Sequence, residues 1–238
     1  MEQVLIIIPT YNEIENIAAI ISAVLDQSNT YHVLIVDDGS PDGTAQKVKD
    51  LQGSYDSRLH LIERSGKLGL GTAYITGFKY AIGKGYQYVM EMDADFSHNP
   101  KDVPRLIEAV KKEGVSMVVG SRYVKGGGFK NWSKYRLMLS YGASLYTRLI
   151  TGMPVKDPTA GFVIYSIEVL QKMDLDKISF VGYAFQIEMK YYCYSLGFKI
   201  VELPITFVDR ELGTSKMDMS IVQEGILGVL QMRLRKYT

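Results

Sequence analysis

Cysteine and long apolar runs are nearly absent from this sequence. Cys193 is the sole cysteine among 238 residues, which excludes a disulfide within the chain and favours a reducing compartment. The apolar run at residues 4–8 is far shorter than the roughly 20 residues that a membrane-spanning helix needs. It also lacks the basic flank and cleavage site of a secretory signal. We therefore expect neither a signal peptide nor a transmembrane segment.

The chain as a whole carries no large excess of positive or negative charge, but one long stretch contains no acidic residues. The formal net charge of +1 argues against nucleic acid as a partner. A mean hydropathy close to zero argues against a disordered chain and against a protein with many membrane spans. Residues 114–156 contain no Asp or Glu, yet they include Arg122, Lys125, Lys130, Lys134, Arg136, Arg148 and Lys156. We expect an anionic group to dock on this basic stretch.

Short β-rich runs alternate with helical patterns along the first 120 residues. The patterns predict strands at 4–8, 33–36, 59–62, 86–92, 116–120 and 200–207. They predict helices from residue 12 to 25 and at 44–51, 72–82, 101–112, 135–150, 184–196 and 221–234. Pro9 is expected to end the first strand, and Asn12 to cap the first helix. The chain is thus predicted to be one α/β domain over 1–238, with a mainly parallel sheet and helices on both faces.

Polar clusters directly follow three of the predicted strands. They are Pro9-Thr10-Tyr11-Asn12-Glu13, Asp37-Asp38 and Asp93-Ala94-Asp95. The carboxyl ends of parallel strands line the ligand crevice in open α/β sheets. We therefore expect the three clusters to share one rim of the sheet.

Two carboxylate pairs carry the clearest chemistry. Asp93 and Asp95 are placed to hold a divalent cation, since Mg²⁺ and Mn²⁺ prefer oxygen ligands. The alternative is a solvated turn. Asp37 and Asp38 offer acceptors for a ribose or a base, or else form only a turn and a helix cap. Together the pairs favour a sugar nucleotide, whose diphosphate needs a cation.

These motifs, in this order, resemble those of the family 2 glycosyltransferases, and more closely those of the polyprenol (dolichol) monophosphate mannose synthases. The resemblance extends from residue 4 to about residue 230. Its pieces are residues 9–13, 36–44, 92–95, 120–123, 131–132, 157–162 and 207–216. It implies a GT-A (Rossmann-like) fold, with a donor half at about 1–120 and an acceptor half, facing the membrane, at about 121–238. It also implies inverting transfer of mannose from GDP-mannose to a polyprenyl (dolichyl) phosphate.

The resemblance also assigns the donor site. It places the guanosine on Pro9, Tyr11, Glu13, Val36 and Asp38, and the ribose, diphosphate and metal near Asp93, Ala94 and Asp95. Ser97 stands where many relatives have a glutamine that binds the metal, so the choice between Mg²⁺ and Mn²⁺ stays open. Arg210 and Lys216 match a mobile loop that closes over the donor.

The acceptor-phosphate site of the family matches Arg122, Arg136 and Ser140. Arg136 and Ser140 are four residues apart, so they share one helix face. A phosphate acceptor is already an anionic nucleophile, so it needs positioning by cations rather than a base. The expected catalytic residues are therefore Arg122, Arg136, Asp93 and Asp95. The alternatives are a UDP-sugar donor, a sugar-hydroxyl acceptor that needs a base such as Asp157, Glu188 or Asp209, and a nucleotide-binding protein without catalysis.

A lipid-linked acceptor requires contact with a membrane surface. The helices at 135–150 and 221–234 pair apolar stripes with basic residues, as interfacial helices do; the alternative is a stripe that faces the core. We expect a peripheral enzyme on the cytoplasmic face, either alone or with a small membrane partner subunit. His98 is expected to lie on the surface.

Overall fold

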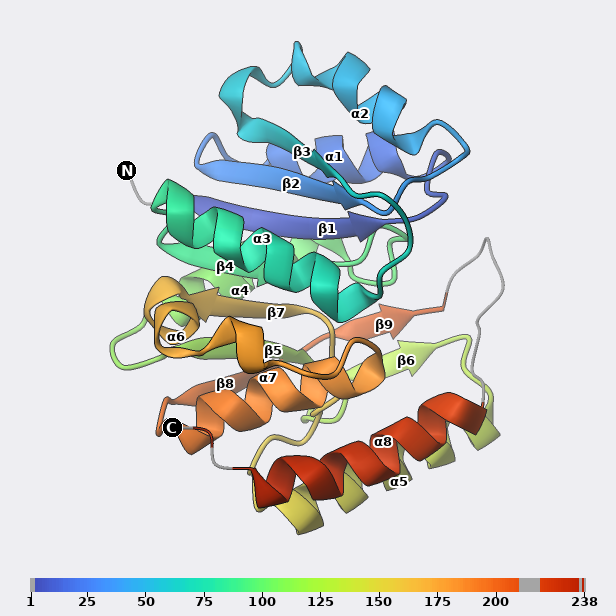
Figure 1. Ribbon diagram of the computed structural model, residues 1–238, viewed down its shortest axis with the longest axis vertical. Coiled ribbons are helices and arrows are strands. Elements are labelled where there is room, and N and C mark those ends of the chain that lie inside the picture. The colour runs from blue at the N-terminus through green and yellow to red at the C-terminus, as the bar shows by residue number, and fades with distance from the viewer. Residues whose placement is uncertain (1–2, 210–218, 236, 238) are drawn as a thin grey trace.

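The computed structural model describes residues 3–209, 219–235 and 237. A seven-stranded sheet runs through the protein in the order β3-β2-β1-β4-β7-β5-β8 (Figure 1). All neighbouring strands are parallel except β7, which is antiparallel to both β4 and β5. The strands are β1 (Val4–Thr10), β2 (Tyr31–Asp37), β3 (Leu59–Glu63), β4 (Tyr88–Glu91), β5 (Met117–Ser121), β7 (Val163–Ser166) and β8 (Ile200–Pro204).

A second, two-stranded sheet joins β6 (Gly128–Lys130) to β9 (Thr206–Val208). It extends past the carboxyl-terminal edge of the main sheet on the side of β5 and β8 (Figure 1). The pairing aligns Phe129 with Phe207, which brings two aromatic side chains from distant parts of the sequence to one place.

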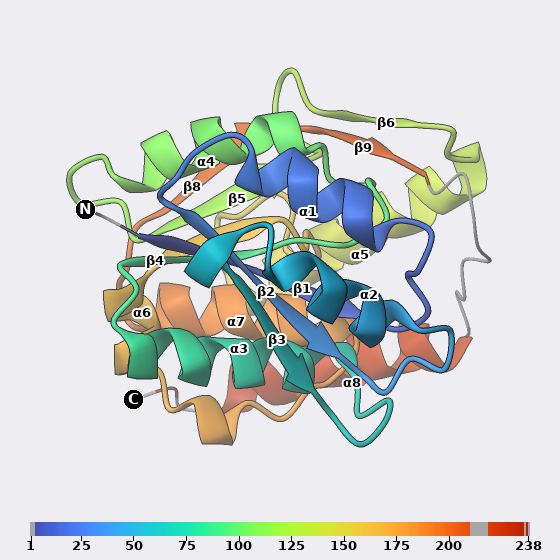
Figure 2. The ribbon, with the colours of Figure 1, turned by 90° about the horizontal axis from the view of Figure 1, so that it is seen from above.

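Helices cover both faces of the sheet, as the alternation of strands and helices predicts (Figure 2). Apolar residues of α1 (Ile17–Leu25), α2 (Thr44–Gln52) and α4 (Val103–Val110) pack on one face. Those of α3 (Leu70–Lys84), α6 (Ile167–Lys172) and α7 (Tyr183–Ser195) pack on the other. The helices α5 (Lys134–Thr151) and α8 (Met219–Leu234) pack against each other beyond this layer. Three short 3₁₀ helices complete the described elements: Asp56–Arg58, Pro100–Asp102 and Leu175–Lys177.

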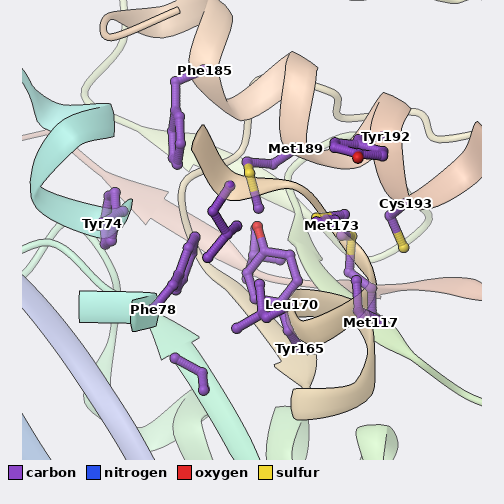
Figure 3. Close-up of a cluster of buried hydrophobic side chains, with 14 of the residues drawn as sticks. Tyr74, Phe78, Met117, Tyr165, Leu170, Met173, Phe185, Met189, Tyr192 and Cys193 are labelled. Atoms are coloured by element: carbon purple, nitrogen blue, oxygen red, sulfur yellow. The ribbon is translucent and has the colours of Figure 1, made fainter. Parts of the chain in front are cut away.

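Strand alternation explains the two-faced core. Leu5 and Ile7 of β1 lie in the cluster under α3 and α7, whereas Ile6 and Ile8 lie in the cluster under α1 and α4. Figure 3 shows the first cluster, where aromatic rings from α3, β7 and α7 fill the space. Gly77 lets α3 approach the sheet closely, because a Cβ there would lie 2.6 Å from Ile7 Cδ1.

The strand order places a crevice beside β1. The chain moves outward from β1 to β2 and β3 and then returns to the opposite side of β1 to form β4. Such a reversal opens a crevice at the carboxyl ends of the two central strands. All three polar clusters follow β1, β2 or β4, so the structure confirms that they share one rim.

Several local expectations were wrong, for identifiable reasons. Pro9 lies within β1 and pairs with Val36. It is tolerated because β4 pairs with β1 only up to Ile7, so the missing N–H of residue 9 faces a side where the ladder has ended. Asn12 adopts a left-handed φ of 61°, and the first helix begins only at Ile17. The predicted strand at 200–207 is divided into β8 and β9, and β6, β7 and α6 were not predicted.

Candidate active site

The loops after β1 and β2 are joined by hydrogen bonds. Asp37 accepts from Thr10 Oγ1 at 2.9 Å and from the Ser40 N–H and Oγ at 2.8 and 2.6 Å. The Glu13 N–H donates to Thr44 Oγ1 at 3.0 Å. Asp37 is 1% exposed, so its carboxylate holds the two loops together rather than facing a ligand. The turn alternative therefore describes Asp37 correctly, although Asp37 does not cap α2, whose N-cap residue is Gly43.

Asp38 lies at the same rim but has a different partner. Arg64, which follows β3, donates from Nε to Asp38 Oδ1 at 2.6 Å and from Nη1 to Thr72 Oγ1 at 2.7 Å. Arg64 thus ties the loop before α3 to the expected nucleotide site. Residues 64–69 were expected to form a loop near the donor, but the contact with Asp38 was not predicted; the position of Arg64 after a third parallel strand was the available signal.

The remaining expected guanosine residues differ in exposure. The ring of Tyr11 is 40% exposed, with Lys67 Nζ 4.9 Å from its centroid, which leaves an open aromatic face at the rim. Pro9 and Glu13 are half-buried. Val36 is fully buried and belongs to the core cluster, so its side chain contributes to packing.

Asp93, Asp95 and Ser97 lie together directly after β4. The carboxylate of Asp95 accepts the Ser97 N–H at 3.0 Å, across a turn in which Phe96 has a φ of 60°. Ser97 is 2% exposed, and its buried Oγ has no hydrogen-bond partner within the described part of the chain. A buried hydroxyl without a partner costs free energy, so a bound ligand at this point would offset that cost.

These residues fit a hard divalent cation. Asp93 and Asp95 supply carboxylate oxygens and Ser97 a hydroxyl, which are ligand types that Mg²⁺ and Mn²⁺ accept. Within residues 3–209, 219–235 and 237, no group of three or more His, Cys, Asp or Glu side chains gathers as a metal site. The described residues thus offer few ligands, which would leave coordination positions for phosphate oxygens. Ala94 is 4% exposed, so what it offers is main chain.

His98 is buried beneath this turn, and the expectation of a surface position was wrong. It is 3% exposed, stacks on Phe162 with ring centroids 4.8 Å apart, and accepts the Asp93 N–H on Nδ1 at 3.1 Å. Burial lowers its pKa, and the neighbouring carboxylates of Asp93 and Asp95 act in the opposite direction. A neutral imidazole with its proton on Nε2 therefore fixes the main chain of the turn.

A buried network of hydrogen-bonded polar side chains lies behind the end of β4. Glu91 accepts from Tyr165 OH at 2.8 Å and from Gln186 Nε2 at 2.5 Å. Lys190 Nζ donates to Gln186 Oε1 at 3.0 Å and to the Ala160 carbonyl at 2.7 Å. Desolvation raises the pKa of Glu91 to about 7 and lowers that of Lys190 to about 8. The network connects β4, α7 and the loop that contains Asp157.

Arg122 is held by Asp157. Its Nε and Nη2 donate to the two carboxylate oxygens at 2.7 and 2.6 Å, and its own N–H donates to Oδ2 at 2.8 Å. Its guanidinium carbon also lies 5.4 to 5.8 Å from the centroids of four aromatic rings, namely Tyr123, Phe129, Trp132 and Phe207. We call these four rings the aromatic cage.

Arg136 lies at the other side of the cage. Its guanidinium is 4.0 Å from the Trp132 ring centroid, and Nη1 donates to Asp209 at 2.8 Å. The side chains of Arg136 and Asp209 are 22% and 28% exposed, so this ion pair is open to solvent. Ser140 is half-buried on the same helix, one turn further along.

The turn at residues 93–97 and the aromatic cage lie next to each other. The ring of His98 lies 5.7 Å from that of Phe207, which is itself packed against Trp132 at 5.7 Å. The Val208 N–H also reaches the Ser97 carbonyl at 3.4 Å. The structure therefore brings the carboxylates after β4 and the cage arginines to the same end of the sheet. Arg210 and Lys216 lie outside the described residues.

The sequence suggested that the basic stretch lacks acidic neighbours, and the structure supplies two from elsewhere in the chain. Asp157 reaches Arg122, and Asp209 reaches Arg136. The aromatic cage was also missed, although the interleaving of Tyr123, Phe129 and Trp132 with arginines was a usable cation–π signal.

Glu188 is buried and hydrogen-bonded to other parts of the fold. It is fully buried and accepts the N–H groups of Ser179 and Phe180 at 3.0 Å each, Tyr237 OH at 3.1 Å and Arg235 Nη1 at 3.3 Å. These donors join α7, the loop before it and the end of α8. The carboxylate is therefore occupied within the fold.

The chain belongs to glycosyltransferase family 2, whose model it matches over residues 5–177. Two curated relatives confirm the closer resemblance. Polyprenol monophosphomannose synthase of Mycolicibacterium smegmatis is 44% identical over 234 residues, covering 98% of this chain and 88% of that protein. Undecaprenyl-phosphate mannosyltransferase of Micrococcus luteus is 46% identical over 227 residues, covering 95% of this chain and 92% of that protein.

Solved structures confirm the GT-A type of fold. Glucosyl-3-phosphoglycerate synthase from Mycobacterium tuberculosis, in complex with Mn²⁺, uridine diphosphate and phosphoglyceric acid, matches with a TM-score of 0.71 at 18% identity. The match covers 98% of this chain and 78% of that one. A complex of the same enzyme with Mn²⁺, UDP-glucose and phosphoglyceric acid matches with a TM-score of 0.70 at 16% identity, covering 98% and 80%. At these identities the likeness concerns the fold alone.

Proposed function

We propose that the chain transfers mannose from GDP-mannose to a polyprenyl phosphate, inverts the anomeric carbon and releases GDP. The names of the two relatives, at 44% and 46% identity over nearly the whole chain, support a mannosyl donor and a polyprenyl-phosphate acceptor. The chain would act as one catalytic domain, with a donor half at about 1–120 and an acceptor half at about 121–238.

The observation that carries the proposal is the state of the two buried acids that a hydroxyl acceptor would need as a base. Asp157 is fully buried and accepts three hydrogen bonds from Arg122, and Glu188 is fully buried among its own donors. Neither of these carboxylates is available to remove a proton from a substrate. The third candidate, Asp209, is partly exposed and is paired with Arg136 at 2.8 Å. A phosphate acceptor is ionised at neutral pH and attacks without a base.

Arg122 and Arg136, the two arginines beside the aromatic cage, are suited to bind the acceptor phosphate. Arg122 is oriented by Asp157, and Arg136 lies at the more open side with Ser140 one helical turn away. An incoming phosphate would compete with Asp209 for Arg136, since both are anions that a guanidinium binds through two N–H groups. The aromatic rings exclude water around Arg122, which strengthens its attraction for an anion.

Asp93, Asp95 and Ser97 would hold a divalent cation, Mg²⁺ or Mn²⁺, and the neighbouring structures with Mn²⁺ support this choice of ligand class. When bound, the cation supplies charge neutralisation for the leaving diphosphate. The chain's own contribution is to fix the two carboxylates. His98 holds the Asp93 main chain, and the Ser97 N–H holds the Asp95 carboxylate.

Two helices support a membrane-surface location. The outer side of α5 exposes Met138 (65%), Tyr141 (56%) and Leu149 (75%), and that of α8 exposes Leu227 (59%) and Leu234 (86%). The side chains named here are therefore exposed rather than packed in the core. None of the described helices combines the length and hydropathy needed to cross a bilayer. We propose peripheral attachment at the cytoplasmic face, alone or with a small membrane partner.

A donor-by-acceptor matrix tests the proposal. Purified protein with Mn²⁺ or Mg²⁺ is given labelled GDP-mannose or UDP-glucose, each with polyprenyl phosphate or with a free sugar. Polyprenyl-phosphate mannose should form only from the first donor with the lipid acceptor. Product from UDP-glucose, or transfer to a sugar hydroxyl at a similar rate, would contradict the proposed reaction. Nucleotide binding without any product would indicate a protein that binds the donor but does not transfer sugar.

A further inference from the structure

A cationic cavity opens beside α5, next to the aromatic cage, with which it shares Tyr123. Its volume is about 190 Å³, and it is lined by Tyr123, Tyr141, Ser144, Leu145, Arg148 and Lys156. The lining includes none of Arg122, Arg136 and Ser140. Two of its residues are cationic and none is acidic.

The cations of this cavity are not neutralised by the part of the chain that the structure describes. Among the side chains that the structure describes, no carboxylate forms an ion pair with Arg148 or Lys156, and Arg148 Nε is buried without a hydrogen-bond partner. The nearby acids are already engaged. Asp157 is paired with Arg122, and Glu202 accepts the N–H groups of Lys156 and Asp157 at 2.8 and 3.0 Å.

The cationic residues of the cavity lie apart from Arg136 along the helix, although Tyr141 and Ser144 of the lining lie close to Ser140. Arg148 follows Arg136 by 12 residues within α5, which corresponds to roughly 18 Å at 1.5 Å per residue. One phosphate group cannot reach both arginines. An anion held by Arg148 is therefore distinct from a phosphate held by Arg136.

The surroundings of the cavity indicate which anion it receives. Tyr141 and Leu145 line it while remaining 56% and 43% exposed, and Leu149, one turn further on the same side of α5, is 75% exposed. A cationic pocket with apolar side chains beside it is complementary to a phosphate group that carries acyl chains. We propose that this cavity binds the headgroup phosphate of an anionic bilayer phospholipid, and so fixes how α5 lies on the membrane.

Vesicle co-sedimentation tests this proposal directly. The full chain is mixed with vesicles of phosphatidylcholine alone or with phosphatidylglycerol added, at constant ionic strength. The unaltered protein should bind the anionic vesicles more tightly. The double variant Arg148→Gln, Lys156→Gln should lose about tenfold in affinity for the anionic vesicles and little for the neutral ones. The matched control Lys101→Gln, Lys112→Gln removes two exposed charges near α4 and should lose far less.

Activity in detergent separates this site from the proposed transfer reaction. With polyprenyl phosphate in neutral detergent, the Arg148→Gln, Lys156→Gln variant should keep the KM for the acceptor within about twofold. A large rise in that KM would mean that the cavity holds the acceptor itself and would overturn the proposal. Equal losses in the cavity variant and the control would also overturn it, as would equal binding of the unaltered protein to both vesicle types. A lack of transfer by the unaltered protein would instead contradict the proposed function alone.

Discussion

Arg122 and Asp157 form a two-point ion pair in which Nε and Nη2 reach separate carboxylate oxygens at 2.7 and 2.6 Å. The two side chains are 9% and 0% exposed. A third hydrogen bond, from the Arg122 N–H, closes the carboxylate to any substrate. Asp157 is therefore a positioning residue for Arg122, and we expect its effect on the proposed acceptor phosphate to pass through that side chain.

Asp157→Asn should lower the free energy of unfolding by about 3 kcal/mol, because it leaves a buried guanidinium without its counter-charge. For a chain of this size that loss corresponds to a Tm lower by on the order of 6–12 °C. Residual activity should show a raised KM for the acceptor with an unchanged pH profile. Thermal unfolding and rate measurements between pH 6 and 9 check both points. The exposed ion-pair variant Asp174→Asn is the control. Loss of an acidic limb, in which the rate of the unaltered protein falls as the pH decreases, would restore Asp157 as a general base.

Ser97→Ala should weaken the binding of Mn²⁺ in the presence of GDP by about three- to tenfold, since it removes one oxygen and leaves both carboxylates. The buried Oγ has no other hydrogen-bond partner in the described residues, so the variant should fold with normal stability. Titration calorimetry gives the affinity. Ser57→Ala, at an exposed position, is the control. Identical Mn²⁺ affinities for both variants and the unaltered protein would remove Ser97 from the metal site.

The histidines of β2 and β3 predict acid sensitivity. His32 Nδ1 lies 3.0 Å and His60 Nε2 3.1 Å from the hydroxyl of Tyr86, and the two rings stack. Burial lowers both pKa values; His60 and Arg58 lower that of His32 further, and Lys84 lowers that of His60. The unfolded chain therefore binds more protons than the folded one below about pH 6.5.

The resulting stability is present above pH 6.5 and is lost as the pH falls below it. Urea unfolding should give a lower free energy of unfolding at pH 5 than at pH 7.5, with part of the difference coming from this pair. The double variant His32→Gln, His60→Gln should reduce the difference between the two pH values. An equal difference in the variant and the unaltered protein would show that other groups cause the acid sensitivity.

Glu91 and Lys190 are linked through Gln186 by buried hydrogen bonds. We therefore expect substitutions of Glu91 and Lys190 to affect stability in a coupled way. Glu91→Gln or Lys190→Met alone should each cost about 3 kcal/mol, because each leaves one buried group charged and unmatched. The double variant should cost less than the sum of the two, since neither charge remains. Urea unfolding of the four proteins gives the coupling energy. Strict additivity would mean that the two groups do not sense each other.

The donor side of the site was predictable from the sequence because its signals are local. Each polar cluster follows a strand directly, and parallel strands bring such ends together whatever the details of packing. Asp93, Asp95 and Ser97 fall within five residues, so their proximity needs no knowledge of the fold.

The acceptor side was less predictable because its contacts join distant segments. Asp209 reaches Arg136 across 73 positions, and Phe207 reaches the aromatic cage through a strand pairing that no local pattern indicates. The strand β7 has only four residues, so it gave no clear period. The sequence likewise did not predict that His98 is buried, because its turn-forming neighbours suggested a surface loop.

The reversed direction of β7 has a consequence for how specificity can change. The strands β5 and β7 are adjacent and antiparallel, with Val119 opposite Val163, so residues 122–162 leave the sheet and return to it at the same edge. The cost of closing such an excursion grows only slowly with its length. Insertions, deletions or exchange of the whole segment between related enzymes would thus alter the receiving substrate while sparing the nucleotide-sugar framework.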